Sequence, residues 1–235
     1  MHNTTKPYRI GCRPGEQGPR FPPSNQDGSD KLATGRKRLQ TTADNTSKEK
    51  LLKFKETTYI GTWNVRTLHA TGTLEVLLHQ LEKYKWSVMS LSETRWTDSG
   101  EINKDGYKII YSGRQDGVHQ GGVAMILRKE AQQSLIGYDA VSPRIIKARF
   151  KTSNGATTII QVYAPTSTSS EEDIDCFYTQ LQSAVQESAN YDMTVIIGDF
   201  NAKVGTDWET WKGAIGKFGY GIENERGKRK EERGY

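Results

Sequence analysis

Short apolar runs that end in polar residues recur along this chain and constrain its fold more than any other feature. Seven of them have the length and the β-branched or aromatic content of strands: Tyr59–Val65, Ser87–Leu91, Tyr107–Tyr111, Val123–Leu127, Ile145–Phe150, Thr157–Tyr163 and Met193–Ile197. The turn-forming residues 152–155 predict that the fifth and sixth runs pair as a hairpin. The chain is therefore expected to build most of its core from strands.

Two segments between these runs have the spacing of amphipathic helices. Leu74, Leu77, Leu78 and Leu81 form one apolar stripe, and a second helix is expected over about Glu171–Ala189, with Ile174, Phe177, Leu181 and Val185 on one face. Strands mixed with helices at intervals predict an α/β (α+β) layered domain.

Polar residues of a particular kind stand at the ends of the predicted strands: Asn64, Glu93, Tyr163, Asp199 and Asn201. Ligands collect at the carboxyl ends of strands in sheet-based folds. Carboxylate and amide oxygens suit Mg²⁺, which takes one or two protein carboxylates and completes its coordination with phosphate and water. Taken alone, each residue is better explained as part of an Asx turn or as a solvated loop charge, but all five together favour a site.

The five residues divide into roles. Glu93 and Asp199 directly follow buried runs and are the candidate metal carboxylates, and Asp199 is also a candidate general base. Asn64 and Asn201 could orient a water or a phosphate oxygen, and Tyr163 could stabilise charge that develops on phosphorus.

The motifs around these residues occur in a fixed order and resemble the endonuclease/exonuclease/phosphatase superfamily. They are Gly61–Arg66, Leu91–Trp96, Gly121–Ala124, Val162–Ser167, Gly198–Gly205, Gly216–Gly219 and Asn224–Gly227. Within it, the sequence is most similar to the apurinic-type endonuclease domain of RTE/BovB-like non-LTR retrotransposons and to the craniofacial development protein 2-like proteins derived from them. The resemblance covers about residues 57–228.

The resemblance implies a four-layer α/β sandwich that cleaves phosphodiester bonds of DNA with Mg²⁺, or with Mn²⁺ in its place. By position it implies a metal ligand at Glu93, a phosphate contact at Tyr163, water activation by Asp199 and water orientation by Asn201. Asn64 would belong to the metal or phosphate site. A phosphatase or phospholipase of the same superfamily is a further alternative, which the Trp-Asn-Val-Arg-Thr and Ser-Glu-Thr-Arg-Trp segments disfavour.

Two departures from the family pattern affect the expected activity. Arg66 stands where many DNA-repair relatives have an aspartate, and no terminal Asp-His pair follows Asn201. The four histidines (His2, His69, His79 and His119) all lie upstream of where that histidine belongs. We therefore expect a domain that lacks its C-terminal strands and has little or no turnover, with a non-catalytic nucleic-acid- or protein-binding fragment as the alternative.

Charge is distributed unevenly between the expected domain and its flanks. Residues 1–55 hold 12 of the 33 Lys and Arg residues but only 5 of the 28 Asp and Glu residues, so the net charge of +5 belongs to a tail. We expect a disordered, basic, Pro/Gly-rich tail at 1–56, the domain at 57–227 and a charged tail at 228–235. Phosphate attraction would come from that basic tail, or from Arg66, Arg95 and Arg114 in the motif loops.

The cellular environment is predicted from what the sequence does not contain. No apolar run approaches the roughly 18 residues of a membrane span, and the first residues have no secretory pattern. The two cysteines, Cys12 and Cys176, make no disulfide framework. An intracellular location, nuclear rather than cytoplasmic, is expected, with DNA as the partner and no membrane association.

Overall fold

A computed structural model describes residues 58–153, 155–189, 191–203, 205–207, 209, 221, 222 and 224 of the chain. The expectations for the tails at 1–56 and 228–235, for Cys12 and for any strand after β9 lie outside these residues. Within them, no helix has the length and apolar character that a membrane crossing requires.

The first sheet has five strands in the order β1-β2-β5-β4-β3. Its strands are β1 (Ile60–Asn64), β2 (Val88–Ser92), β3 (Ser99–Lys104), β4 (Tyr107–Ser112) and β5 (Val123–Leu127). Helix α1 (Thr73–Leu81) connects β1 to β2, which run parallel, whereas the other pairs are antiparallel.

The second sheet has four strands in the order β6-β7-β8-β9. They are β6 (Leu135–Ser142), β7 (Ile145–Thr152), β8 (Gly155–Tyr163) and β9 (Met193–Asp199), and the short helix α2 (Lys129–Ser134) leads into them. Helix α3 (Glu171–Gln186) crosses between the parallel strands β8 and β9. It begins at Ser170, whose hydroxyl accepts a hydrogen bond from the Asp173 amide at 3.2 Å and satisfies one of the free N–H groups of the first turn.

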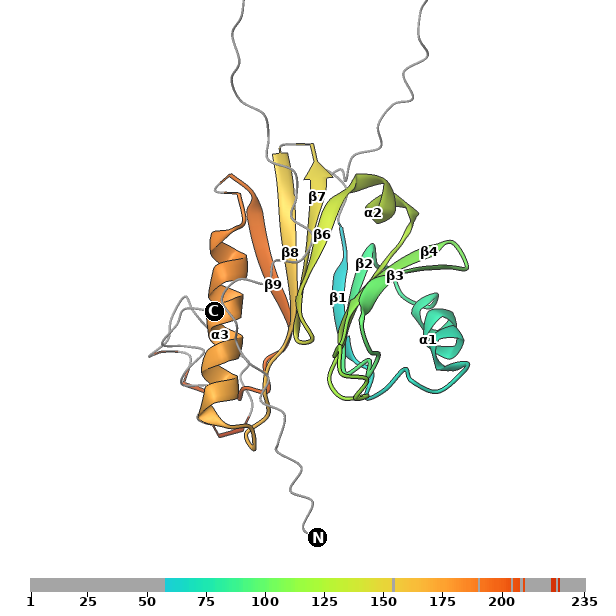
Figure 1. The fold of residues 1–235 in the computed structure, drawn as a ribbon. Helices are drawn as coiled ribbons and strands as arrows, with labels where there is room; N and C mark the ends of the chain where they lie inside the picture. The colour runs from blue at the N-terminus through green and yellow to red at the C-terminus, as the bar shows by residue number, and fades with distance from the viewer. Residues whose placement is uncertain are drawn as a thin grey trace, which may run out of the picture.

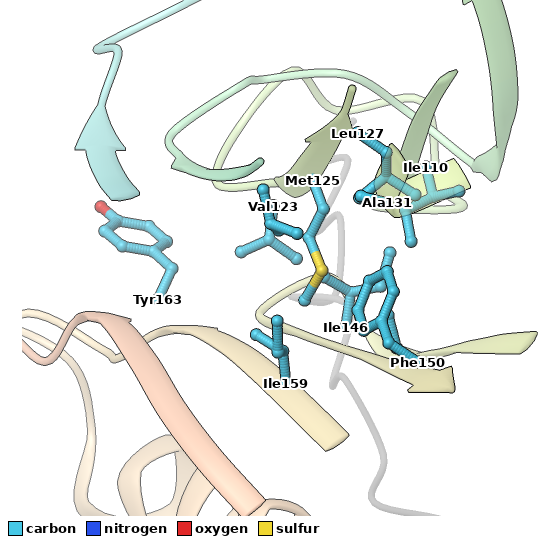
Figure 2. Packing of buried hydrophobic residues seen from close by; sticks show 11 residues of the cluster. Ile110, Val123, Met125, Leu127, Ala131, Ile146, Phe150, Ile159 and Tyr163 are labelled. Carbon is cyan, nitrogen blue, oxygen red and sulfur yellow. The ribbon is translucent and has the colours of Figure 1, made fainter. Parts of the chain in front are cut away.

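Three apolar clusters hold the elements in four layers (Figure 1). One cluster fills the space between the two sheets and includes Met125, Ile146, Phe150 and Ile159, as Figure 2 shows. A second joins α1 to the outer face of the first sheet through Leu77, Leu78 and Leu81, and a third joins α3 to the second sheet. The layer order is therefore helix, sheet, sheet, helix.

The apolar runs predicted most of these elements. All seven expected strands are present, and the 152–155 turn joins β7 and β8 in the expected hairpin. Three elements were not predicted: β3, α2 and β6. Strand β3, with the sequence SGEINK, alternates exposed and half-buried residues at the edge of the sheet. Strand β6, with the sequence LIGYDAVS, pairs with β7 in an irregular register. Neither sequence is a continuous apolar run.

Candidate active site

The two parallel strand pairs bring their carboxyl ends to one edge of the sandwich. Asn64 at the end of β1 is in register with Ser92 at the end of β2, which places Glu93 beside it. In the other sheet, Tyr163 is in register with Asp199. Because β1 and β9 contact each other, both pairs of strand ends lie together. The structure thus brings together the five residues that the strand-end pattern singled out.

The Asn64 side chain joins the two carboxylates across the sheets. Its Nδ2 donates to Glu93 Oε1 at 2.7 Å and to Asp199 Oδ2 at 2.9 Å. The Arg66 amide donates to Asn64 Oδ1 at 3.0 Å, which fixes the amide with its nitrogen toward the carboxylates. The neutral side-chain amide of Asn64 therefore holds two negatively charged carboxylates, Glu93 and Asp199, within hydrogen-bond distance of the same nitrogen.

Asp199 and Asn201 are fixed by a second set of hydrogen bonds. The Asn201 amide donates to Asp199 Oδ1 at 2.9 Å, and Asn201 Nδ2 donates to the Ala164 carbonyl at 2.7 Å. The Ala164 amide donates to the Asp199 carbonyl at 2.8 Å. The Asp199 carboxylate therefore has donors on both oxygens and keeps lone pairs for a further ligand.

Tyr163 lies between the apolar interior and the carboxylates. Its ring belongs to the cluster between the sheets, and Figure 2 shows its hydroxyl turned away from the other apolar side chains. Burial raises the pKa of the Tyr163 phenol, and the negative charge of Glu93 raises this pKa further. A raised phenol pKa keeps the hydroxyl protonated at neutral pH, so that it can donate a hydrogen bond.

Backbone strain is concentrated in the loops that follow these strands. Five of the six non-glycine residues with positive φ among those described lie there: Arg66, Glu93, Arg95, Asp98 and Asn201, with φ between 50° and 60°. This left-handed conformation disfavours residues that have a Cβ atom, and it is common at functional sites.

The three arginines expected to contact phosphate differ in how free they are. Arg66 and Arg95 are exposed in the loops after β1 and β2. Arg114 instead pairs with Asp116 through two guanidinium nitrogens, with Nε to Oδ1 at 3.0 Å, and this pairing raises its pKa. Arg66 and Arg95 therefore fit an anion-contacting role better than Arg114 does.

The exposed rings of His69 and His119 have their centroids 3.7 Å apart and are tilted by 37° relative to each other. His119 Nδ1 lies 3.0 Å from the Arg95 carbonyl oxygen. Neither histidine hydrogen bonds to Glu93 or Asp199 in the part of the chain that the structure describes.

Sequence reasoning missed two polar residues at this edge of the sandwich. Gln161 is fully buried and crosses between the sheets, where Nε2 donates to Ser92 Oγ at 2.9 Å and to the Leu91 carbonyl at 3.3 Å. Arg144, in the turn between β6 and β7, places its guanidinium 5.2 Å from the centre of the Tyr163 ring. The predicted hairpin already held a signal for Arg144, because antiparallel pairing sets the start of β7 beside the end of β8.

The donor set fits a hard divalent cation. Among the described residues, no group of three or more His, Cys, Asp or Glu side chains could hold a metal ion by itself. Two carboxylates from different strands nevertheless approach one amide, and Mg²⁺ is usually held by one or two carboxylates with substrate phosphate and water as its other ligands. Glu93 and Asp199 are the residues that would hold it.

The sequence also matches known proteins. It is 39% identical over 180 residues to craniofacial development protein 2 of Bos taurus, covering 77% of this chain and 30% of that protein. It is 35% identical over 219 residues to craniofacial development protein 2 of Tragulus javanicus, covering 93% of this chain and 37% of that protein. The chain thus spans about a third of the length of the curated relatives it matches.

Solved structures with a similar fold are more distant in sequence. The endonuclease domain of TRAS1, a telomere-specific non-LTR retrotransposon, matches with a TM-score of 0.47 at 16% identity, over 72% of this chain and 66% of that one. The AP endonuclease LMAP of Leishmania major also has a TM-score of 0.47 at 16% identity, over 60% and 55%. Because both TM-scores are below 0.5, the family assignment rests on the sequence matches.

The sequence model of the endonuclease/exonuclease/phosphatase family matches residues 61–221, which include all five strand-end residues and both sheets. The chain belongs to the endonuclease/exonuclease/phosphatase family.

Proposed function

We propose that this domain, of retrotransposon origin, is a phosphodiesterase of low turnover that acts on DNA with a divalent cation, Mg²⁺ or Mn²⁺, held by Glu93 and Asp199. The observation that carries the proposal is the convergence of Glu93 Oε1 and Asp199 Oδ2 on the Asn64 amide, at 2.7 and 2.9 Å. The family, whose name includes endonucleases and exonucleases, and the exposed Arg66 and Arg95 in the loops beside the carboxylates support a nucleic acid as the substrate.

The residues of the chain divide the chemistry between them. Asp199 accepts a proton from the attacking water, and the Asn201 amide at 2.9 Å fixes the orientation of its carboxylate. The water oxygen bonds to phosphorus as the P–O bond to the leaving sugar oxygen breaks, and that oxygen takes a proton from solvent. The protonated Tyr163 hydroxyl donates toward the phosphate oxygens, where negative charge builds up in the transition state, while both N–H groups of the Asn64 side chain hold Glu93 and Asp199 in place. The cation, when bound, supplies a Lewis acid that polarises the phosphate.

Plasmid nicking tests this proposal. Supercoiled DNA is incubated with the purified chain in Mg²⁺ or Mn²⁺, with Glu93→Gln and Asp199→Asn as the disabling variants. Asp192→Asn is the matched control, because Asp192 pairs with Arg149 at the other end of the second sheet. We expect both disabling variants to lose about 10²-fold or more in rate, and the control to keep it.

Mn²⁺ binding, measured by electron paramagnetic resonance, separates the possible outcomes. Nicking that survives Glu93→Gln or chelation by EDTA would overturn the proposal. Mn²⁺ and DNA binding that both depend on Glu93, without cleavage under single-turnover conditions, would instead identify the alternative, a non-catalytic nucleic-acid-binding domain.

A further inference from the structure

Arg144 makes three kinds of contact with one residue of the site. Its Nη1 donates to the Tyr163 carbonyl at 3.2 Å, its own carbonyl accepts from the Tyr163 amide at 2.8 Å, and its guanidinium carbon lies 5.2 Å from the ring centre. A guanidinium at this distance from an aromatic face is attracted by the negative charge of the ring. The backbone and the ring of Tyr163 are therefore held by the same side chain.

The contacts of Arg144 extend to the rest of the site through one peptide group. Nη1 also donates to the Ala164 carbonyl at 3.3 Å, and this same oxygen accepts the Asn201 side chain at 2.7 Å. The Ala164 amide in turn donates to the Asp199 carbonyl. A displacement of the Ala164 peptide would therefore move both β8 and the loop after β9.

We propose that Arg144 is the positioning residue of this site: its guanidinium fixes the Tyr163 ring and the Ala164 peptide, and so sets the direction of the Tyr163 hydroxyl and of Asn201. This inference rests on the proposed function, because it assigns to Arg144 the geometry of that same site. Arg144 acts through Tyr163 and Asn201 rather than on the substrate.

The test compares two substitutions that separate charge from shape. Arg144→Met keeps most of the side-chain length and removes the charge, while Arg144→Lys keeps the charge and loses the planar fork that spans two carbonyls. Arg128→Met is the matched control, because Arg128 lies 4.6 Å above the ring of Trp86, in a different part of the fold.

Fluorine NMR of protein labelled with 3-fluorotyrosine gives a readout that does not require catalysis. The signal that disappears in Tyr163→Phe is assigned to Tyr163, and its chemical shift is compared between the variants at neutral pH. Because the guanidinium lies 5.2 Å from the centre of the ring, we expect the shift to change in Arg144→Met and to change less in Arg144→Lys, while Arg128→Met leaves it unchanged. An unchanged chemical shift in folded Arg144→Met would overturn the proposal.

Kinetics provides the second readout. A positioning role predicts that both Arg144 variants lose about 10- to 100-fold in kcat with little change in KM, since small misplacements of catalytic groups have effects of this size. A rise in KM with kcat unchanged would overturn the proposal, because Arg144 would then bind substrate directly. If Arg144→Met does not fold, a wild-type Tyr163 chemical shift and a wild-type kcat in Arg144→Lys would likewise overturn it.

The positioning role of Arg144 and the proposed function can fail separately. A wild-type chain that does not cleave DNA but has a Tyr163 chemical shift that depends on Arg144 would contradict the proposed function and keep the positioning role. Cleavage that needs Glu93, together with a Tyr163 signal that does not respond to substitution of Arg144, would support the proposed function and contradict the positioning role.

Discussion

The strand pair β8–β9 has a polar cluster at each end: the carboxylates of one cluster are paired with cationic side chains, and those of the other are not. At the end where the strands begin, Arg149 donates to the Asp192 carboxylate from Nε at 2.6 Å and from Nη2 at 3.0 Å. Beside this pair, Nζ of the buried Lys147 lies 3.1 Å from Glu187 Oε2. At the end where they finish, Glu93 and Asp199 share only the neutral amide of Asn64. Within the described residues, no ion pair joins either carboxylate to a lysine or arginine.

This difference separates charges that stabilise the fold from charges that are available to a ligand. Ion pairs with good hydrogen-bond geometry satisfy their own charges and attract nothing further. Two carboxylates without a cationic partner repel each other, and a divalent cation removes that repulsion. We therefore expect substitutions of the charged residues at the first end to change stability, and substitutions of the charged residues at the second end to change binding and catalysis.

The largest effect on stability is expected at Gly198, where β9 approaches β8 closely next to Asp199. Gly198 has φ of 134°, and a Cβ atom there would lie 2.0 Å from the Val162 carbonyl oxygen. Gly155, at the start of β8, has φ of 132° but no atom within 4 Å of such a Cβ. Gly198→Ala should lower the free energy of unfolding by about 4 kcal/mol or more, because it combines backbone strain with a backbone clash.

Gly155→Ala isolates the strain and should lower the free energy of unfolding by about 1–3 kcal/mol. Urea denaturation of both variants measures the difference. Equal losses of unfolding free energy in the two variants would show that the close approach of Gly198 to Val162 adds nothing to the effect of backbone strain.

A smaller effect is expected at the paired end of the sheet. Asp192→Asn removes the charge that Arg149 binds, and Thr158 Oγ1, 3.2 Å from the Asp192 carboxylate, loses a charged acceptor. We expect a loss of about 1–3 kcal/mol in the free energy of unfolding at pH 7, with plasmid nicking unchanged. Loss of nicking in a folded Asp192→Asn variant would contradict the assignment of stability to the Asp192 end of the strand pair and of catalysis to the Glu93–Asp199 end.

The same variant makes a pH-dependent prediction. The hydrogen bonds from Arg149 lower the pKa of Asp192 below its ordinary value of 3.8. A carboxylate whose folded pKa is depressed contributes stability above its unfolded pKa, and this contribution disappears as the pH falls through the folded pKa. The stability difference between wild type and Asp192→Asn should therefore be constant from pH 7 to about 5 and narrow below about pH 4. A difference that stays constant down to pH 2 would contradict it.

The sequence predicted the site better than it predicted the paired end. Asn64, Glu93, Tyr163 and Asp199 could be found because each stands next to an apolar run, and parallel strands bring such ends together. The partners of Lys147 could not, because Asp139 and Glu187 come from a neighbouring strand and from the end of α3. Such pairings depend on how the layers meet, which has no local signature.

The same reason explains the elements that were missed. Strand β3 has the exposed, polar sequence Ser99–Lys104 and is held by its register with β4, with Ile102 opposite Ile109. Helix α2 has six residues, and no side chain caps its beginning. Both elements depend on their neighbours rather than on their own sequence.

The smallest effect is expected from relieving backbone strain at the edge of the site. Arg95 and Asp105 both have positive φ, 57° and 51°, but Arg95 lies in the loop after Glu93 and Asp105 in the turn between β3 and β4. A left-handed residue other than glycine is strained by about 1–2 kcal/mol, and glycine gives back about 0.5–1 kcal/mol of this through its flexibility in the unfolded chain. Both Arg95→Gly and Asp105→Gly should therefore raise the free energy of unfolding by about 0.5–1 kcal/mol or less.

DNA affinity should distinguish these two substitutions. If Arg95 contacts a phosphate, Arg95→Gly lowers the slope of log affinity against log salt by about 0.9, the value for one neutralised phosphate, while Asp105→Gly leaves the slope unchanged. Fluorescence anisotropy with a labelled duplex over a salt series measures both. A slope that Arg95→Gly does not alter would show that Arg95 makes no phosphate contact and would remove it from the nucleic-acid surface.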